Sequence, residues 1–184
     1  APSTLDLGPH ALVFTGKMDY RPNIDAILWF TEQVLPLIEA QIPDVALYVV
    51  GQRPHGSLQS LTQKPNIHIT GFVTSGQPFL HATAAYIAPL RMGSGTRLKL
   101  LEALAAGCAV VATPEAASGV SQNLLDALVL ADKPEAFAEA VRRVVSEPEL
   151  RAALGRAARE HVREYEWSAI LPRLLTVYDE LIDG

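Results

Sequence analysis

AAYIAPLRMGSGTRLKLLEALAAGCAVVAT, residues 84–113, is the stretch of sequence that decides the fold. Its apolar run at residues 84–88 stops before a proline, and a loop with two glycines follows. A helix-forming segment comes next and ends at Gly107, since a glycine commonly terminates a helix. A second apolar run occupies residues 109–112. This order predicts a strand, a helical crossover and another strand.

Apolar runs of the same kind occur on both sides of this unit. The predicted strands are residues 11–15, 45–50, 66–70, 84–88, 109–112 and 127–130. The run at 45–50, VALYVV, has no polar alternation, which is typical of a strand covered on both faces. Strands that alternate with helices are joined by right-handed crossovers into a parallel sheet. The expected fold class is therefore α/β, with a Rossmann-like, doubly wound parallel sheet of about six strands in three layers.

Prolines and apolar periodicity predict where the helices lie. Pro22 suits the first turn of a helix after the first strand, and Pro36 is expected to kink that helix or split its last turn. The C-terminal part of the sequence is helical throughout. Its first helix carries an apolar stripe made of Phe137, Ala140, Val141, Val144 and Val145. Its last helix is expected at about residues 169–182, with Ser168 as its cap and Trp167 as its anchor.

Length and charge limit the classes of protein to which the chain can belong. With 184 residues, of which 49% are hydrophobic, the chain suits one compact domain, which we place at residues 11–184. Residues 1–10 are interpreted as a linker or an expression-derived segment. Twenty acidic against fifteen basic residues give a formal net charge of -5, the wrong sign for a surface that binds nucleic acid. Nucleic acid is therefore not expected as a partner.

Cysteine, histidine and apolar content exclude further classes. Cys108 is the single cysteine, so it makes no internal disulfide, and we expect an inert core thiol. The five histidines lack the spacing of metal ligands, so no metal site is predicted. No apolar run reaches the roughly 20 residues of a membrane span, and the first residues do not resemble a signal peptide. A cytoplasmic protein is expected.

The glycine-containing loop before the helix is the first candidate site. Ligands of open parallel sheets bind at the carboxyl ends of the strands, where this loop is expected. Glycines let the backbone approach a ligand closely, and the free N–H groups of a helix N-terminus attract anions. The candidate phosphate-binding residues are Gly93, Ser94, Gly95, Thr96 and Arg97, with Lys99 as a further charge. The sequence predicts a phosphate here.

Glu102 follows Gly95 by seven residues, which is two helical turns. The two residues therefore lie on one helix face about 10 Å apart, a span that suits a nucleotide. A diphosphate at the helix start would leave the Glu102 carboxylate to accept hydrogen bonds from the ribose hydroxyls. The alternative is that the glycines form only a flexible turn and that Glu102 is a solvated helix residue. The small neighbours Ala105 and Ala106 favour close packing instead.

Two further loops carry cations at predicted carboxyl ends of strands. After Gly16, either Lys17 or Arg21 could clamp a phosphate, although a solvated surface pair remains the alternative. Arg53 follows the second strand in a similar way, but Pro54 there is equally typical of an ordinary turn.

In order along the chain, VFTGKMDYRPNIDAILWF, LYVVGQRP, NIHITGFV, APLRMGSGTRLKLLEALAAGCAVVAT and YEW follow a known pattern. The chain resembles the C-terminal, donor-binding domain of family 4 retaining glycosyltransferases with the GT-B fold. The resemblance implies a nucleotide-diphosphate sugar, most commonly of UDP or GDP, held between two Rossmann-like domains. This chain would supply the nucleotide half. Its partner would be its own N-terminal acceptor-binding domain, which this sequence does not contain.

The resemblance also implies residue roles. Lys17, after Gly16, matches the basic residue that contacts phosphate. Phe72 and Val73 match the segment whose backbone contacts the base. Glu102 matches the second acidic residue of the family's Glu-seven-Glu motif and so the ribose ligand.

The chain departs from the family pattern at two positions. Ser94 stands where the first glutamate of the motif is expected, and the GSGTRLK form occurs in one branch of such enzymes. Asn23 stands where the phosphate clamp has its second basic residue. Arg21 and Arg53 are the candidates for the missing positive charge.

The reaction that the resemblance implies is retaining glycosyl transfer through an oxocarbenium-like transition state. The domain would stabilise the departing diphosphate without a metal or a cofactor, would turn over poorly without its N-terminal half, and would meet a membrane only peripherally. No catalytic residue is assigned. The alternatives are a nucleotide-sugar epimerase of related architecture and a nucleotide-binding or docking module without catalysis, which the serine at position 94 favours.

Overall fold

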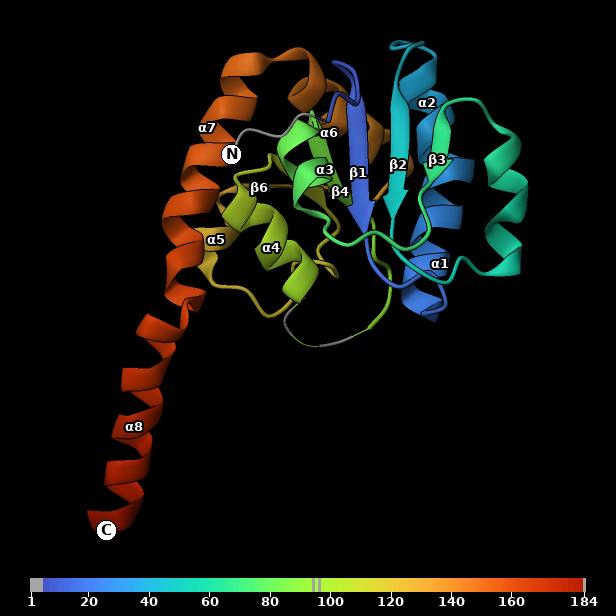
Figure 1. Cartoon of the computed structure of the whole chain (residues 1–184). Coiled ribbons are helices and arrows are strands. Elements are labelled where there is room, and N and C mark those ends of the chain that lie inside the picture. Colours follow the sequence, from blue (N-terminus) through green and yellow to red (C-terminus); the bar gives the residue numbers. More distant parts are fainter. Residues whose placement is uncertain (1–4, 94, 96, 184) are drawn as a thin grey trace.

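Six parallel strands form one sheet in the computed structural model, which describes residues 5–93, 95 and 97–183 (Figure 1). The strands are β1 (Ala11–Thr15), β2 (Ala46–Val50), β3 (Ile67–Ile69), β4 (Ala85–Ala88), β5 (Val110–Ala112) and β6 (Leu128–Leu130). Each predicted strand is confirmed to within one residue at either end. The Rossmann-like fold class is confirmed with them.

The strand order β3-β2-β1-β4-β5-β6 fixes where a ligand can bind. From β1 the chain builds the sheet in one direction through β2 and β3, and from β4 it builds in the other direction through β5 and β6. β1 and β4 are direct neighbours, with Leu12 paired to Ala85. The loops that leave their carboxyl ends therefore diverge, and open α/β sheets bind ligands in that crevice.

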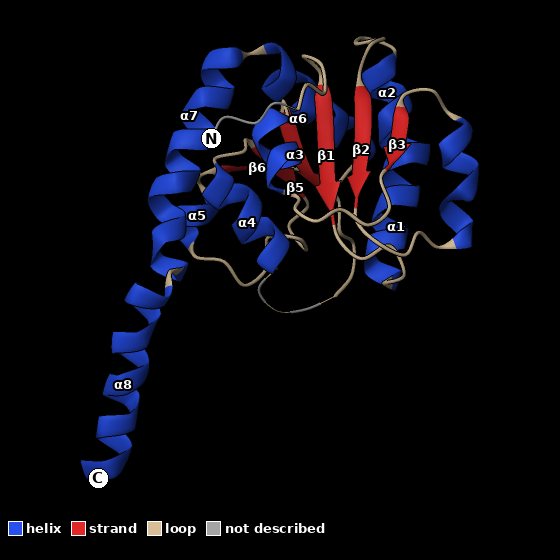
Figure 2. Cartoon of the chain, viewed as in Figure 1, coloured by secondary structure: helices blue, strands red, loops and turns tan. Residues whose placement is uncertain are grey.

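Helices cover both faces of the sheet. Figure 2 shows α3 and α4 in front of the sheet and α6 behind it. The helices are α1 (Arg21–Trp29), a π-helical turn (Phe30–Val34), α2 (Leu35–Glu39), a 3-10 helix η2 (Gly56–Gln63), α3 (Gln77–Ala82), α4 (Leu98–Ala106), α5 (Gln122–Leu125), α6 (Pro134–Ser146), α7 (Pro148–His161), a 3-10 helix η3 (Val162–Tyr165) and α8 (Trp167–Asp183). The interruption expected at Pro36 is confirmed: the missing N–H of the proline breaks the ladder, and the π-helical turn comes directly before α2.

The β2 strand is covered on one face more than on the other. Leu47 and Val49 are fully buried, whereas Ala46 and Tyr48 are half-buried and His68 on β3 is exposed. The expected cover on both faces is present but thinner here, since α3 reaches this strand through Phe79, whose ring lies 6.4 Å from the Tyr48 ring. The His68 ring also stacks on the Tyr48 ring, with 4.6 Å between centroids.

The C-terminal helices confirm one prediction and correct another. All five residues of the predicted stripe on α6 are buried, and α6 packs on β4, β5 and β6. α8 begins at Trp167, so Ser168 lies inside the helix and not before it. Trp167 is 70% exposed, so it does not anchor this helix, which projects away from the sheet in Figure 1. No helix in the described ranges is long and apolar enough to cross a membrane.

The described part of the predicted linker, residues 5–10, packs against the domain. Leu7 is 7% exposed and belongs to the core, and its carbonyl oxygen accepts a hydrogen bond from the Tyr48 hydroxyl at 3.4 Å. His10 pairs with Asp44 through Nδ1 and Oδ1 at 2.8 Å.

Candidate functional site

Two adjoining cavities open where the crevice between β1 and β4 is expected. The first cavity, of about 440 Å³, is lined by loops that follow β1, β2 and β3 and by one face of α4. The second cavity, of about 470 Å³, lies between the β1 loop, the start of α1 and the start of α4. The two share Gly16, Lys17 and Lys99 in their walls. A ligand that spans both cavities therefore passes these three residues.

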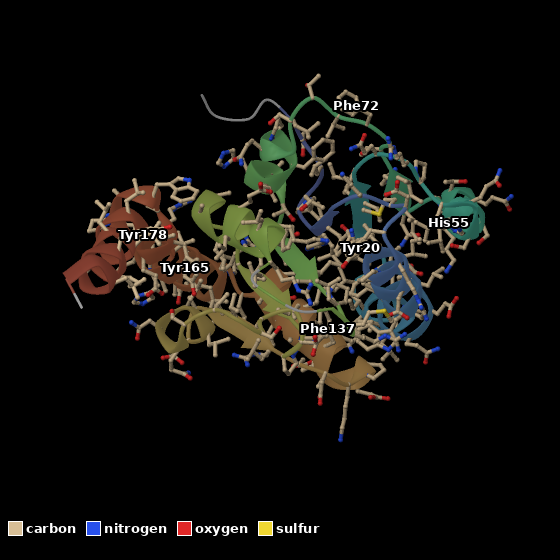
Figure 3. All side chains as sticks on the ribbon, turned by 90° about the horizontal axis from the view of Figure 1, so that it is seen from below. Tyr20, His55, Phe72, Phe137, Tyr165 and Tyr178 are labelled. Atoms are coloured by element: carbon tan, nitrogen blue, oxygen red, sulfur yellow. The ribbon has the colours of Figure 1, made fainter. Side chains whose placement is uncertain are left out.

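The first cavity brings together residues that the sequence assigned to three different roles. Gly16 and Lys17, the predicted phosphate contacts, line it with Phe72 and Val73, the predicted base contacts. Glu102, the predicted ribose ligand, lines the same cavity from α4. Figure 3 looks onto the carboxyl ends of the strands and shows Phe72 at the outer edge of the molecule. The Phe72 ring is 73% exposed there.

The loops after β1 and β2 approach each other closely because glycines leave room. A Cβ atom added to Gly51 would lie 1.7 Å from the carbonyl oxygen of Gly16. The Gly16 N–H donates to the Val50 carbonyl at 3.0 Å, and the Met18 N–H donates to the Gln52 carbonyl at 2.9 Å. These backbone contacts fix the position of the Lys17 segment at the mouth of both cavities.

Lys99, predicted from the sequence only as a further charge, reaches the site from α4. It comes from the first turn of α4, lines both cavities and is half-buried. Its Nζ atom donates a hydrogen bond to Asn23 Oδ1 and lies 4.5 Å from the centroid of the Phe14 ring. Burial, followed by repulsion from Arg97, lowers the pKa of Lys99 to about 8, while Glu102 acts in the opposite direction.

A signal for Lys99 was present in the sequence. It precedes Glu102 by three residues, and residues three apart share one face of a helix. If Glu102 faces the ligand, Lys99 faces it too. The prediction for the missing clamp charge named Arg21 and Arg53 of other loops instead.

Asn23 connects the two lysines of the site. It is 3% exposed, and its Nδ2 donates to the Lys17 carbonyl at 2.8 Å while its Oδ1 accepts from Lys99. The residue that departs from the family pattern therefore contacts both the loop after β1 and the amino group from α4.

The two arginines proposed for the missing charge differ in their positions. Arg21 is the first residue of α1, is exposed, and is not among the residues that line the two cavities. Arg53 does line the second cavity, where it forms an ion pair with Asp19 at 3.3 Å. Its φ of 57° is left-handed, an uncommon conformation for a residue other than glycine.

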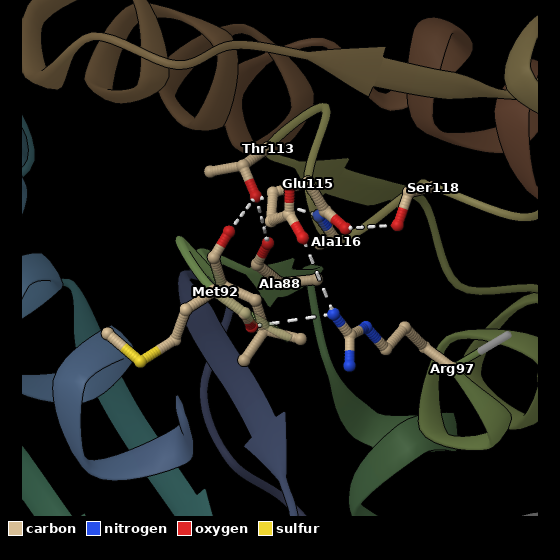
Figure 4. A network of polar contacts seen from close by, with 8 residues as sticks. Ala88, Met92, Arg97, Thr113, Glu115, Ala116 and Ser118 are labelled. Atoms are coloured by element: carbon tan, nitrogen blue, oxygen red, sulfur yellow. Dashed lines mark hydrogen bonds and ion pairs between the residues drawn. The ribbon is translucent and has the colours of Figure 1, made fainter. Parts of the chain in front are cut away.

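Arg97 turns its guanidinium inward, beneath the predicted phosphate loop. Its side chain is 10% exposed, donates to the Met92 carbonyl at 3.4 Å and lies 3.8 Å from Glu115 (Figure 4). It also contributes to the wall of the second cavity. The described loop residues Gly93 and Gly95 are exposed and line neither cavity, while Ser94 and Thr96 lie outside the described residues.

A threonine on the next strand end anchors this loop. Thr113 Oγ1 donates to the Leu90 carbonyl and accepts from the Ala116 N–H at 3.1 Å (Figure 4). Thr113 is 4% exposed, so both bonds are shielded from water. No motif in the sequence indicates this anchor.

A family model described as glycosyl transferases group 1 matches residues 9–147 of the chain. The chain belongs to this family. A curated relative of this group 1 domain is the phosphatidyl-myo-inositol mannosyltransferase of Mycolicibacterium smegmatis, 28% identical over 176 residues. The alignment covers 91% of this chain and 44% of the relative, so the chain spans under half of that protein's length.

Solved structures share the fold of this group 1 domain. TarM of S. aureus superposes with a TM-score of 0.75 at 18% identity, covering 95% of this chain and 36% of TarM. HepE of Anabaena, solved in complex with UDP, gives a TM-score of 0.73 at 12% identity, covering 93% of this chain and 49% of HepE. These neighbours confirm the expected fold.

Proposed function

We propose that this domain binds the nucleoside diphosphate part of a sugar donor, a UDP-sugar or a GDP-sugar, as the donor-binding half of a retaining glycosyltransferase. The observation that carries the proposal is the first cavity, whose wall combines the Gly16 loop, the Phe72 segment and Glu102. Family membership and a group 1 relative named as a mannosyltransferase support it. They give the epimerase alternative no support.

The layout of the cavities suggests how the donor lies. The base and ribose would occupy the first cavity, with the Glu102 carboxylate accepting hydrogen bonds from the ribose hydroxyls. The diphosphate would cross the wall that both cavities share, beside Lys17. The sugar would then reach the second cavity, which Asp19 and Tyr20 line.

In the transfer reaction this domain would stabilise the negative charge of the departing diphosphate. When the bond between the sugar and the diphosphate breaks, negative charge grows on the leaving phosphate, and cations placed there lower the barrier. Among residues 5–93, 95 and 97–183, no group of three or more His, Cys, Asp or Glu side chains is placed to hold a metal ion. Because Lys17 and Lys99 line the wall that both cavities share, we propose that lysine side chains balance this charge and that a chelator leaves nucleotide binding unchanged. The acceptor would bind to the protein's own N-terminal domain.

The test is calorimetric titration of the domain with UDP, GDP and ADP in the presence of EDTA. One nucleotide is expected to bind, and Glu102→Ala is expected to weaken it at least about ten-fold, because hydrogen bonds to a carboxylate are lost. Glu160→Ala is the matched control, because Glu160 is an exposed glutamate on α7 that lines neither cavity.

The results that contradict the proposal are equally definite. No binding of any nucleotide by the folded domain, or equal affinity in the Glu102→Ala variant, would remove it. Binding by the domain without sugar transfer after recombination with its N-terminal half would leave a nucleotide-binding module in place of the enzyme.

A further inference from the structure

The strongest unexplained feature is the contact between a buried asparagine and a half-buried lysine from opposite sides of the crevice. Asn23 belongs to α1, and Lys99 belongs to α4, 76 positions later in the sequence. Removing a lysine ammonium from water costs free energy unless a partner or a ligand compensates for the lost hydration. Here the partner is neutral, so the positive charge is not cancelled by the contact.

The geometry keeps the Lys99 ammonium at the wall that both cavities share. A Cβ atom on Gly16 would lie 2.8 Å from Lys99 Nζ, so the glycine leaves the room that the amino group occupies. The Phe14 ring lies beneath the ammonium at 4.5 Å, a cation–π distance. Asn23 Oδ1 accepts a hydrogen bond from one of its N–H groups. An ammonium has three N–H donors, so donors remain for a ligand.

We propose that Lys99 makes the second cationic contact to the donor diphosphate, in place of the basic residue that Asn23 replaces, and that Asn23 positions its amino group. This inference rests on the proposed nucleotide-binding function. The competing arginines fit less well: the Arg53 side chain is 71% exposed and paired with Asp19, and Arg21 lines neither cavity.

The same geometry makes the affinity for a diphosphate depend on pH. The pKa of Lys99, lowered to about 8, means that the free site loses this positive charge between pH 7 and pH 9. Arg97, directly before α4, repels the ammonium, and Glu102 on α4 attracts it. From the other side of the crevice, Lys17 and the Arg53–Asp19 pair line the same cavity wall. A diphosphate binds the protonated form, so its affinity is expected to fall as pH rises through 8.

The experiment compares a nucleoside diphosphate with its nucleoside, UDP with uridine or GDP with guanosine, at pH 7.0 and pH 9.5, and the nucleoside corrects each diphosphate affinity for ionisation of the base at the higher pH. For the unaltered domain, the diphosphate affinity should fall about ten-fold between these pH values. Lys99→Met should lower it by about ten-fold at pH 7.0 and remove the pH dependence, with nucleoside affinity unchanged. Lys99→Arg should keep the affinity at pH 9.5, because arginine stays charged. Lys64→Met, an exposed lysine at the end of η2, is the control.

A second variant tests the positioning role of Asn23. In Asn23→Ala the ammonium loses an acceptor that favours its charged form, so the midpoint of the pH profile should move to lower pH. A variant that merely loosened the loop would weaken binding at all pH values without moving this midpoint. Melting temperatures of all variants show which of them are folded.

The possible failures are distinguishable. If neither the diphosphate nor the nucleoside binds, the proposed function fails and the inference fails with it. If the diphosphate binds with the same affinity to Lys99→Met as to the unaltered domain, or if Arg53→Met causes the larger loss, only the role of Lys99 is overturned.

Discussion

The two loops that flank the crevice are held in place in different ways. The first loop, residues 16–20 after β1, is fixed mainly by backbone against backbone, with Gly16 and Gly51 in contact, and the Asn23 side chain adds one bond to the Lys17 carbonyl. The second loop, residues 89–93 after β4, is fixed by side chains: Thr113 bonds to Leu90, and Arg91 forms a bidentate pair with Asp25. A loop held by backbone tolerates little change in its glycines, whereas a loop held by side chains depends on residues far away in the sequence.

The largest effect is expected for the backbone contact. In Gly51→Ala the new methyl group would lie 1.7 Å from the Gly16 carbonyl oxygen, so the strand ends must separate. We expect the free energy of unfolding to fall by about 3 kcal/mol, measured by urea denaturation. Gly56→Ala is the control, since a Cβ atom there meets nothing within 4 Å. Equal stability of the two variants would show that the first loop is not fixed by this contact.

The next effect concerns the Lys99 amino group, which extends from α4 across the crevice and is disfavoured in its charged form. The pKa of Lys99 is about 8 in the folded protein and 10.5 when unperturbed, so folding disfavours its protonated form. Below pH 8 the penalty is complete, and between pH 8 and 10.5 the unfolded chain binds more protons, so stability rises with pH. From pH 7 to 9.5 this group adds about 2 kcal/mol to the free energy of unfolding.

To measure this effect, the pH dependence of the free energy of unfolding is compared between the unaltered domain and the Lys99→Met variant. Cys108 has a pKa raised to about 12 by burial, and its contribution runs in the opposite direction above pH 9. Subtracting the pH profile of Lys99→Met from that of the unaltered domain cancels such terms. A difference profile that stays flat from pH 7 to 9.5 would mean that the amino group is as solvated as a surface lysine.

The fold could be predicted from sequence because its signals are local. Each strand is a short apolar run that ends at a turn residue, and periods and prolines mark the helices. Glu102 and Lys17 could be placed near the crevice from sequence because a helix spacing or a strand end carries them, and both line the first cavity. The contact of Lys99 with Asn23 was not found, because it joins two segments whose proximity depends on the strand order.

Two further differences in burial have the same physical origin. The apolar run of β2 does not show that the sheet ends one strand away, which leaves Tyr48 half-buried. An aromatic residue such as Trp167 is usually buried, but α8 projects from the domain and leaves it exposed. Burial of a side chain depends on what lies opposite, and a single segment of sequence does not contain that information.

A smaller loss of stability is expected for the side-chain anchor of the second loop. Thr113→Val keeps the shape of the side chain but leaves the Leu90 carbonyl and the Ala116 N–H without their bonds to Oγ1. We expect a loss of about 2 kcal/mol in the free energy of unfolding. Thr62→Val, which removes one exposed bond to the Gln59 carbonyl, should cost less than about 0.5 kcal/mol. Equal losses in the two variants would contradict the anchoring role.

The smallest effect is expected for a glycine of the second loop, and it completes the comparison with Gly51. A Cβ atom on Gly93 would lie 2.8 Å from the guanidinium nitrogens of Arg97, and its φ of 109° disfavours a side chain. The obstacle is the end of a flexible side chain, so Arg97 can move where the Gly16 backbone cannot. Gly93→Ala should therefore cost only about 1 kcal/mol in unfolding free energy, mostly from backbone strain. A loss as large as that of Gly51→Ala would mean that the second loop is as rigidly held as the first.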